Sequence, residues 1–205
     1  MFALVESGSI TKYLKGNQGI QIGDLKYSKA IYTLWTEAER NAIGIYTVEY
    51  DDSNKKDEKW YINTNQSHAF ADNKVTASYG SATAKKHADT TWTQQQIDDG
   101  DAPDGADTDT VAVEGLKTRL IKTVKAQAEG ELNRTDWYIT RKAEKNTAIP
   151  SAITTHRDAV RSKQDSMCTA ITNASDTPAL ETLYTFTIQD DGTVTRPLGE
   201  LPTLE

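Results

Sequence analysis

Cysteine and long apolar runs are nearly absent from this 205-residue sequence. The one cysteine, Cys168, cannot form a disulfide within the chain, so the fold does not depend on an oxidising compartment. No apolar run approaches the ~20 residues that cross a bilayer, and residues 1–6 lack the basic flank and apolar stretch of a signal peptide. The sequence therefore predicts a protein made in a cytoplasm, without a membrane partner.

Clustered positive charge is also missing. The formal net charge is −7, and the basic residues are dispersed among acidic ones. A protein that binds nucleic acid needs Lys and Arg gathered on one surface, since phosphate contacts supply most of the affinity. One local basic stripe is interpreted as a solvated helix face: Lys117, Arg119, Lys122 and Lys125. No nucleic-acid partner is expected.

Motifs that carry catalysis or bind metals do not occur in the sequence. HExxH, paired cysteines, the phosphate-binding GxxxxGK[ST] and the GxSxG elbow are all missing. His156 and Cys168 are 12 residues apart, about 18 Å along one helix, which is too far for a nucleophile and its base. We expect no enzyme activity, no cofactor and no metal. A loose calcium site near Asp99 stays a minor alternative, because an EF-hand counted from Asp99 fails at Pro103 and Thr110.

Residues 1–80 have the pattern of a β-rich domain with one short helix. Apolar alternation predicts strands at 2–6, 9–14, 20–22 and 45–50, then a hairpin or meander from residue 60 to 79. Thr36 and Glu39 form a capping box that begins the helix, which Gly44 ends. Trp35 and Trp60 are interpreted as core residues. Carbohydrate binding by Trp35, Trp60 and Trp92 is the alternative.

The second half of the chain predicts an antiparallel helical hairpin. Residues 81–114 form an acidic, glycine-punctuated connector, and the hairpin covers 115–175. Its apolar stripes are Leu116, Leu120, Val124, Ala128 and Leu132, then Ile153, Val160, Met167 and Ile171. Pro150 opens the second helix, with Ser151 as its cap. Residues 176–205 are predicted as a short β-hairpin, with its first strand at 183–188, and an extended tail. The whole is of the α+β class.

A motif between the two helices resembles a known family. Residues 132–137 read LNRTDW, Ala148-Ile149-Pro150 follow, and residues 155–161 read THRDAVR. This resembles the C-terminal module of tailed-bacteriophage tail-fibre and tail-assembly-chaperone proteins. In physical terms, Thr135 or Asp136 can cap a following turn. Trp137 can pack onto the seam between the helices and fix their angle.

The resemblance implies a non-catalytic structural component of a phage tail, at the tail tip, baseplate or fibre attachment. Its partners would be other tail proteins (fibre, baseplate or tail tube), within an oligomeric assembly in the virion. A tail-fibre assembly chaperone is the first alternative and a glycan-binding receptor module the second. The residues expected to serve structure or interaction are Trp35, Thr36, Glu39, Asp136, Trp137, Pro150 and Arg157.

Overall fold

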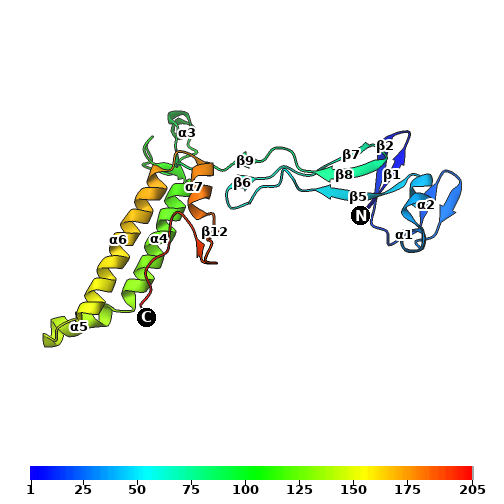
Figure 1. The fold of residues 1–205 in the computed structure, drawn as a ribbon. Helices are drawn as coiled ribbons and strands as arrows, with labels where there is room; N and C mark the ends of the chain where they lie inside the picture. Colours follow the sequence, from blue (N-terminus) through cyan, green and yellow to red (C-terminus); the bar gives the residue numbers. More distant parts are fainter. Residues whose placement is uncertain (205) are drawn as a thin grey trace. The chain divides into compact units, whose positions relative to one another are not determined.

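The structure is a computed structural model that describes residues 1–204, and it confirms the predicted α+β class. The chain divides into two compact units, unit 1 from Met1 to Thr83 and unit 2 from Ala84 onward. The division lies close to the boundary predicted between residues 80 and 81. The five-stranded sheet belongs to unit 1 and the long helices to unit 2 (Figure 1).

One five-stranded sheet organises unit 1, with the order β2-β1-β5-β8-β7. The bounds are Phe2–Glu6 (β1), Ser9–Leu14 (β2), Ile45–Asp51 (β5), Ser67–Ala71 (β7) and Lys74–Ser78 (β8). Two predicted hairpins are confirmed, β1 with β2 around Ser7-Gly8 and β7 with β8 around Asp72-Asn73. The strands β5 and β8 pair in parallel, a long-range contact that no local pattern predicts.

Side chains on the two faces of this sheet pack into two separate clusters. Successive residues of a strand point to opposite faces, so Leu4 joins one cluster while Ala3 and Val5 join the other. The first cluster also contains Leu14, Ile20, Ile31, Tyr32 and Ile45. The second also contains Val48, Val75 and Ala77. Both faces of the sheet are therefore buried over its centre.

Short elements pack against the first cluster. They are β3 (Ile20–Ile22), β4 (Leu25–Tyr27), α1 (Ile31–Leu34) and α2 (Glu37–Ala42). The strand predicted at 20–22 is confirmed. At the end of unit 1, β6 (Tyr61–Ile62) pairs with β9 (Thr83–Ala84). Trp60 is 3% exposed, so its interpretation as a core residue is confirmed.

The predicted capping box begins α2. The Thr36 hydroxyl accepts a hydrogen bond from the Glu39 backbone N–H at 3.3 Å, and the Glu39 carboxylate accepts one from the Thr36 N–H at 2.7 Å. The Glu39 carboxylate accepts from the Thr36 N–H and also from the Thr36 hydroxyl, and these two bonds hold the pKa of Glu39 below its ordinary value. Helix α2 then ends before Gly44, whose φ of 82° favours glycine. Both predicted ends of the helix are confirmed.

Thr36→Ala is expected to destabilise unit 1 by about 1 kcal/mol, because an N-terminal amide of α2 loses its acceptor. Urea unfolding followed by tryptophan fluorescence measures this, since Trp35 and Trp60 both belong to unit 1. Thr36→Ser keeps the hydroxyl and is the matched control. Equal midpoints for the Ala and Ser variants would show that the cap contributes nothing.

Unit 2 is built around two long helices that lie side by side, α4 (Leu116–Asn133) and α6 (Ser151–Asn173) (Figure 1). They confirm the predicted hairpin. Two shorter helices accompany them, α5 (Asp136–Lys145) and α7 (Thr177–Tyr184). The residues buried on α4 and α6 include Leu116, Leu120, Val124, Ala128, Ile153, Val160, Met167 and Ile171. Eight of the nine predicted stripe positions are thus buried, and Leu132 is half-buried.

Two predictions are wrong, one for the start of α6 and one for the tail. Ser151 is the first helical residue and not the cap, because Pro150 already holds the extended conformation before the helix (φ −57°, ψ 139°). The strand predicted at 183–188 starts too early, since Leu183 and Tyr184 belong to α7. Asp176 caps α7 by accepting from the Ala179 N–H at 2.8 Å, and Pro178 suits its first turn.

Short elements complete unit 2. The predicted connector contains β10 (Thr90–Thr91), α3 (Gln94–Asp98) and β11 (Val111–Val113), so it is more ordered than its composition indicated. Thr93 and Gln96 form a second capping box at α3. The C-terminal β-hairpin is confirmed as β12 (Thr187–Ile188) paired with β13 (Val194–Thr195).

The connector also closes the N-terminal end of α4. The Asp89 carboxylate accepts from the Gly115 N–H at 2.7 Å and from the Thr118 hydroxyl at 2.8 Å. The Leu116 and Lys117 amides donate to backbone carbonyls of the same segment, at residues 86 and 87. A Cβ at position 115 would collide with the Ala88 backbone, so only glycine fits there. The first amides of α4, which no helix can satisfy internally, thereby have acceptors.

Asp89→Asn is expected to lower the stability of unit 2 at neutral pH. It should also make that stability fall less as the pH is lowered. The Gly115 amide, then Thr118 and Lys122, hold the pKa of Asp89 below its ordinary value. A carboxyl with a lowered folded-state pKa stabilises fully above its unfolded pKa, about 3.9. That contribution disappears as the pH falls through the folded-state pKa. Urea midpoints from helical circular dichroism should therefore converge for wild type and variant in acid. A constant offset at every pH would contradict this.

Candidate functional site

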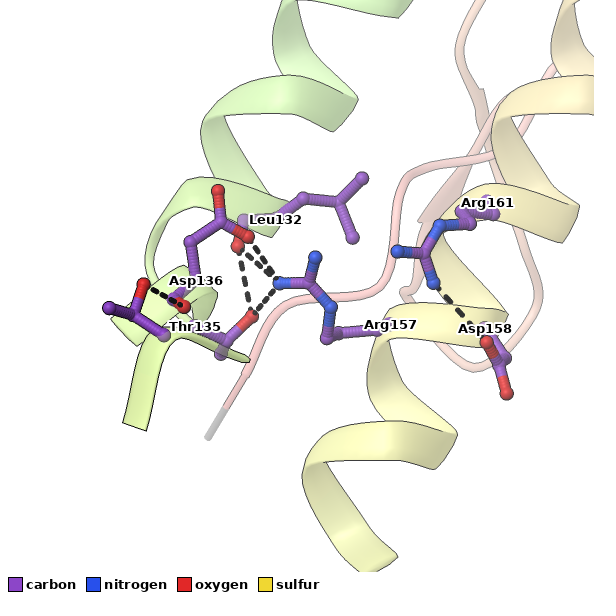
Figure 2. A network of polar contacts seen from close by, with 7 residues as sticks. Leu132, Thr135, Asp136, Arg157, Asp158 and Arg161 are labelled. Atoms are coloured by element: carbon purple, nitrogen blue, oxygen red, sulfur yellow. Dashed lines mark hydrogen bonds and ion pairs between the residues drawn. The ribbon is translucent and has the colours of Figure 1, made fainter. Parts of the chain in front are cut away.

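The most connected polar site of unit 2 lies where α4, α5 and α6 meet. Between α4 and α5 stands Thr135, which is fully buried. Its hydroxyl donates to the Leu132 carbonyl at 2.9 Å, and its own N–H donates to the same oxygen. Both bonds join residues three positions apart, so α4 ends in a tight turn at this corner (Figure 2).

Arg157 reaches into this corner from α6 and is 7% exposed. Its Nη1 donates to the Leu132 carbonyl at 2.7 Å and to the Thr135 hydroxyl at 2.6 Å, and lies 2.8 Å from Asp136 Oδ1 (Figure 2). We call these four residues, Leu132, Thr135, Asp136 and Arg157, the corner clasp. The guanidinium meets both a carboxylate and the negative end of the α4 dipole, which offsets much of the cost of burying its charge.

The ion pair one turn further along α6 differs in its environment. Arg161 lies 3.3 Å from Asp158, and both side chains are exposed, at 49% and 70%. In Figure 2 the only interaction drawn for Arg161 is the one with Asp158, and none joins this pair to the corner. Exposed pairs of this kind contribute about 0–1 kcal/mol. Arg161 therefore serves as an internal comparison for Arg157.

The prediction that Trp137 packs on the helix seam is wrong. Its side chain is 51% exposed, because Thr135 and Arg157 already fill the corner. The indole instead lies against Tyr138, with ring centroids 3.8 Å apart, and under the Arg141 guanidinium at 4.8 Å. Capping of α5 by Thr135 is wrong as well, since the hydroxyl makes no bond to that helix. Asp136 lies inside the first turn of α5, where a carboxylate is favourable.

The seven residues singled out from the sequence fall in three places. Asp136 and Arg157 come together in the corner clasp, with Trp137 just outside it. Pro150 is exposed at the start of α6. The remaining three, Trp35, Thr36 and Glu39, lie in unit 1, where the Trp35 ring packs on the first core cluster and edge-on to Tyr27. Sequence reasoning missed Leu132 as a participant, since a backbone carbonyl leaves no signal in the residue type.

Other reactive groups do not converge. Cys168 is half-buried on α6, and burial raises the pKa of its thiol, which keeps it protonated at neutral pH. Among residues 1–204, no three His, Cys, Asp or Glu side chains gather as metal ligands would. Within the same residues, no helix is both long and apolar enough to cross a membrane.

None of the three tryptophans considered for carbohydrate binding is fully exposed. Trp60 is buried and Trp35 is half-buried in unit 1, while Trp92 is half-buried in unit 2. A sugar stacks on an exposed aromatic face, and Trp60 has none to offer. The arrangement of these indoles speaks against the glycan-binding alternative.

Comparison with known proteins adds no relative. No family model, no curated protein and no solved structure matches the chain.

Proposed function

We propose that the chain is a non-catalytic structural component of a bacteriophage tail, placed at the tail tip, baseplate or fibre attachment, and that it works through protein–protein contacts. The observation that carries the proposal is its surface area of 13402 Å². A compact monomer of 22.7 kDa exposes about 9,500 Å², and two separate compact domains sharing that mass expose about 11,500 Å². The excess over two domains, about 2,000 Å², is more than the ~800 Å² that one partner contributes to a standard specific interface.

The character of that surface supports the same proposal. Large apolar side chains are more than 50% exposed in both units, as with Leu34 and Ile62 in unit 1 and Ile188 and Val194 in unit 2. Ile188 and Val194 are partners across the β12–β13 hairpin, so they form a pair. Contiguous exposed apolar groups are typical of surfaces that partners cover. An assembly of other tail proteins provides such partners.

The assignment to a phage tail rests on the resemblance of the LNRTDW and THRDAVR motifs to tail-fibre and tail-assembly-chaperone proteins. Each motif contributes residues to the corner clasp, Thr135 and Asp136 from the first and Arg157 from the second. The corner clasp sets the direction in which α5 leaves the hairpin. The two motifs therefore serve the structure of the hairpin. Residues that set the direction of an exposed helix suit a protein whose task is to present surfaces.

Quantitative mass spectrometry of gradient-purified virions tests the proposal. The chain should be present at a constant ratio to the tail-tube protein through successive purification steps. A host cytoplasmic protein measured in the same samples serves as the control and should decline. Absence of the chain from virions would overturn a structural role.

The tail-fibre assembly chaperone is distinguished by a second measurement. Fibre protein is expressed with and without this chain, and its trimer is quantified by native gel and protease resistance. Trimer yield that depends on the chain, together with absence from virions, would establish the chaperone alternative. A structural component instead leaves fibre trimerisation unchanged.

A further inference from the structure

The outer face of α5 is an unpartnered surface of aromatic and basic residues. None of the ten residues of α5 is buried, and Trp137 is 51% exposed. With 3.6 residues per turn, five side chains fall within an arc of about 140°. They are Trp137, Tyr138, Arg141, Lys142 and Lys145. We call them the cationic arm.

The cationic arm joins two aromatic rings to three positive charges, those of Arg141, Lys142 and Lys145. Arg141 lies over both aromatic rings, 4.8 Å from the Trp137 centroid and 5.1 Å from that of Tyr138. The one carboxylate near the start of the arm, on Asp136, is paired with Arg157. The acid within α5, Glu144, borders the arc about 20° beyond Trp137, whereas Lys142 and Lys145 lie further from it. The arm therefore offers apolar rings flanked by cations, a combination favoured at interfaces.

A complementary surface lies at the other end of the same hairpin. Residues 98–109 contain six aspartates and no Lys or Arg, and all six side chains are exposed: Asp98, Asp99, Asp101, Asp104, Asp107 and Asp109. On β11, which follows this run, Val111 and Val113 point to one side of the strand and are 45% and 58% exposed. We call the run and these two valines the acidic end.

The two surfaces cannot meet within one copy. The acidic end adjoins the start of α4, while the cationic arm follows its end, and the 18 residues between span about 27 Å. We propose that the cationic arm of one copy docks on the acidic end of a second copy, with the aromatic rings against the valines and cations against aspartates. The contact is heterologous, so it joins copies head to tail into a ring or an open chain. This docking proposal does not depend on the assignment of the chain to a phage tail.

Charge reversal at each end separately tests the docking. One variant carries Arg141→Glu, Lys142→Glu and Lys145→Glu. The other carries Asp101→Lys, Asp104→Lys and Asp109→Lys, three aspartates whose side chains accept no hydrogen bond that the acidic end depends on. Sedimentation velocity of the full chain at low ionic strength should show self-association that weakens with salt. Each variant should lose at least about tenfold in affinity.

Mixing the two variants gives the decisive result. Each variant keeps one native surface, so a mixture should form a 1:1 dimer through the native arm of one variant and the native acidic end of the other, while neither variant associates alone. The control reverses three exposed lysines of unit 1, Lys12, Lys26 and Lys29, and should associate like wild type. Circular dichroism verifies that every variant is folded.

Three outcomes would overturn the proposal. The first is a wild-type chain that stays monomeric at low salt over the whole concentration series. The second is self-association that both reversals leave unchanged. The third is a closed two-fold dimer that only the α5 variant disrupts, which would mean that two arms meet each other. Trp137→Ala adds an independent check, since removing the indole should weaken association without changing charge.

Discussion

Arg157→Ala is expected to lower the free energy of unfolding of unit 2 by about 3 kcal/mol. The buried Thr135 hydroxyl would lose the donor that it accepts from, the Leu132 carbonyl would lose one of its donors, and Asp136 would lose its ion-pair partner. Thr135 is fully buried, so water cannot easily replace the guanidinium. The aliphatic part of the Arg157 side chain is lost as well, which leaves a gap at the junction of three helices. Urea unfolding followed by helical circular dichroism measures the change.

Arg161→Ala is the matched control for this experiment. It removes the same side chain from the same helix one turn later, where the ion pair with Asp158 is exposed. The expected loss is within about 1 kcal/mol. If the two substitutions had equal effects, the corner clasp would not stabilise the hairpin. Arg157→Lys distinguishes charge from geometry, because one ammonium on a flexible stem cannot reproduce the planar guanidinium.

Leu180→Ala is expected to cost about 2–5 kcal/mol, the range for a leucine removed from a well-packed core. Leu180 is fully buried on α7. The same helix is tied to the start of unit 2 by the Thr177 hydroxyl, which donates to the Lys85 carbonyl at 2.6 Å. The loss should therefore appear as a lower urea midpoint for the whole helical unit.

Ile188→Ala provides the comparison for Leu180→Ala. Ile188 lies four residues beyond α7 and is 78% exposed, so its truncation should change stability by less than about 0.5 kcal/mol. Similar losses at positions 180 and 188 would mean that α7 does not pack as a core helix.

Local signals in the sequence predicted much of the fold correctly. The recurrence of apolar residues every fourth position placed α4 within a residue or two, and the Thr36–Glu39 spacing placed the start of α2. Turns with positive φ, at Ser7-Gly8 and Asp72-Asn73, placed two hairpins. In each case the determining interactions lie within a few residues of one another, so the pattern alone contains them.

Long-range and competing interactions explain the failures. The parallel pairing of β5 with β8 joins residues 27 positions apart, and no local pattern encodes it. Trp137 was assigned to the seam because large aromatic residues usually fill cores. The corner was instead filled by a small hydroxyl and a buried arginine, whose partner is a backbone carbonyl 25 residues away. For α7, the apolar run of 183–188 resembled a strand, but the cap at Asp176 begins a helix earlier.

The hydrogen-bond partners for the first turn of α4 precede the helix in the sequence, and a partner for its last turn follows it. The two ends therefore gain these partners at different times during synthesis. The acceptors for its first amides, at residues 86–89, leave the ribosome before the helix does. The donor for its last turn, Arg157, emerges 25 residues after Leu132. At about 5–20 residues per second, the last turn of α4 waits roughly one to five seconds for its contact with the Arg157 guanidinium. The N-terminal end of α4 therefore has its hydrogen-bond partners before the C-terminal end gains the contact with Arg157.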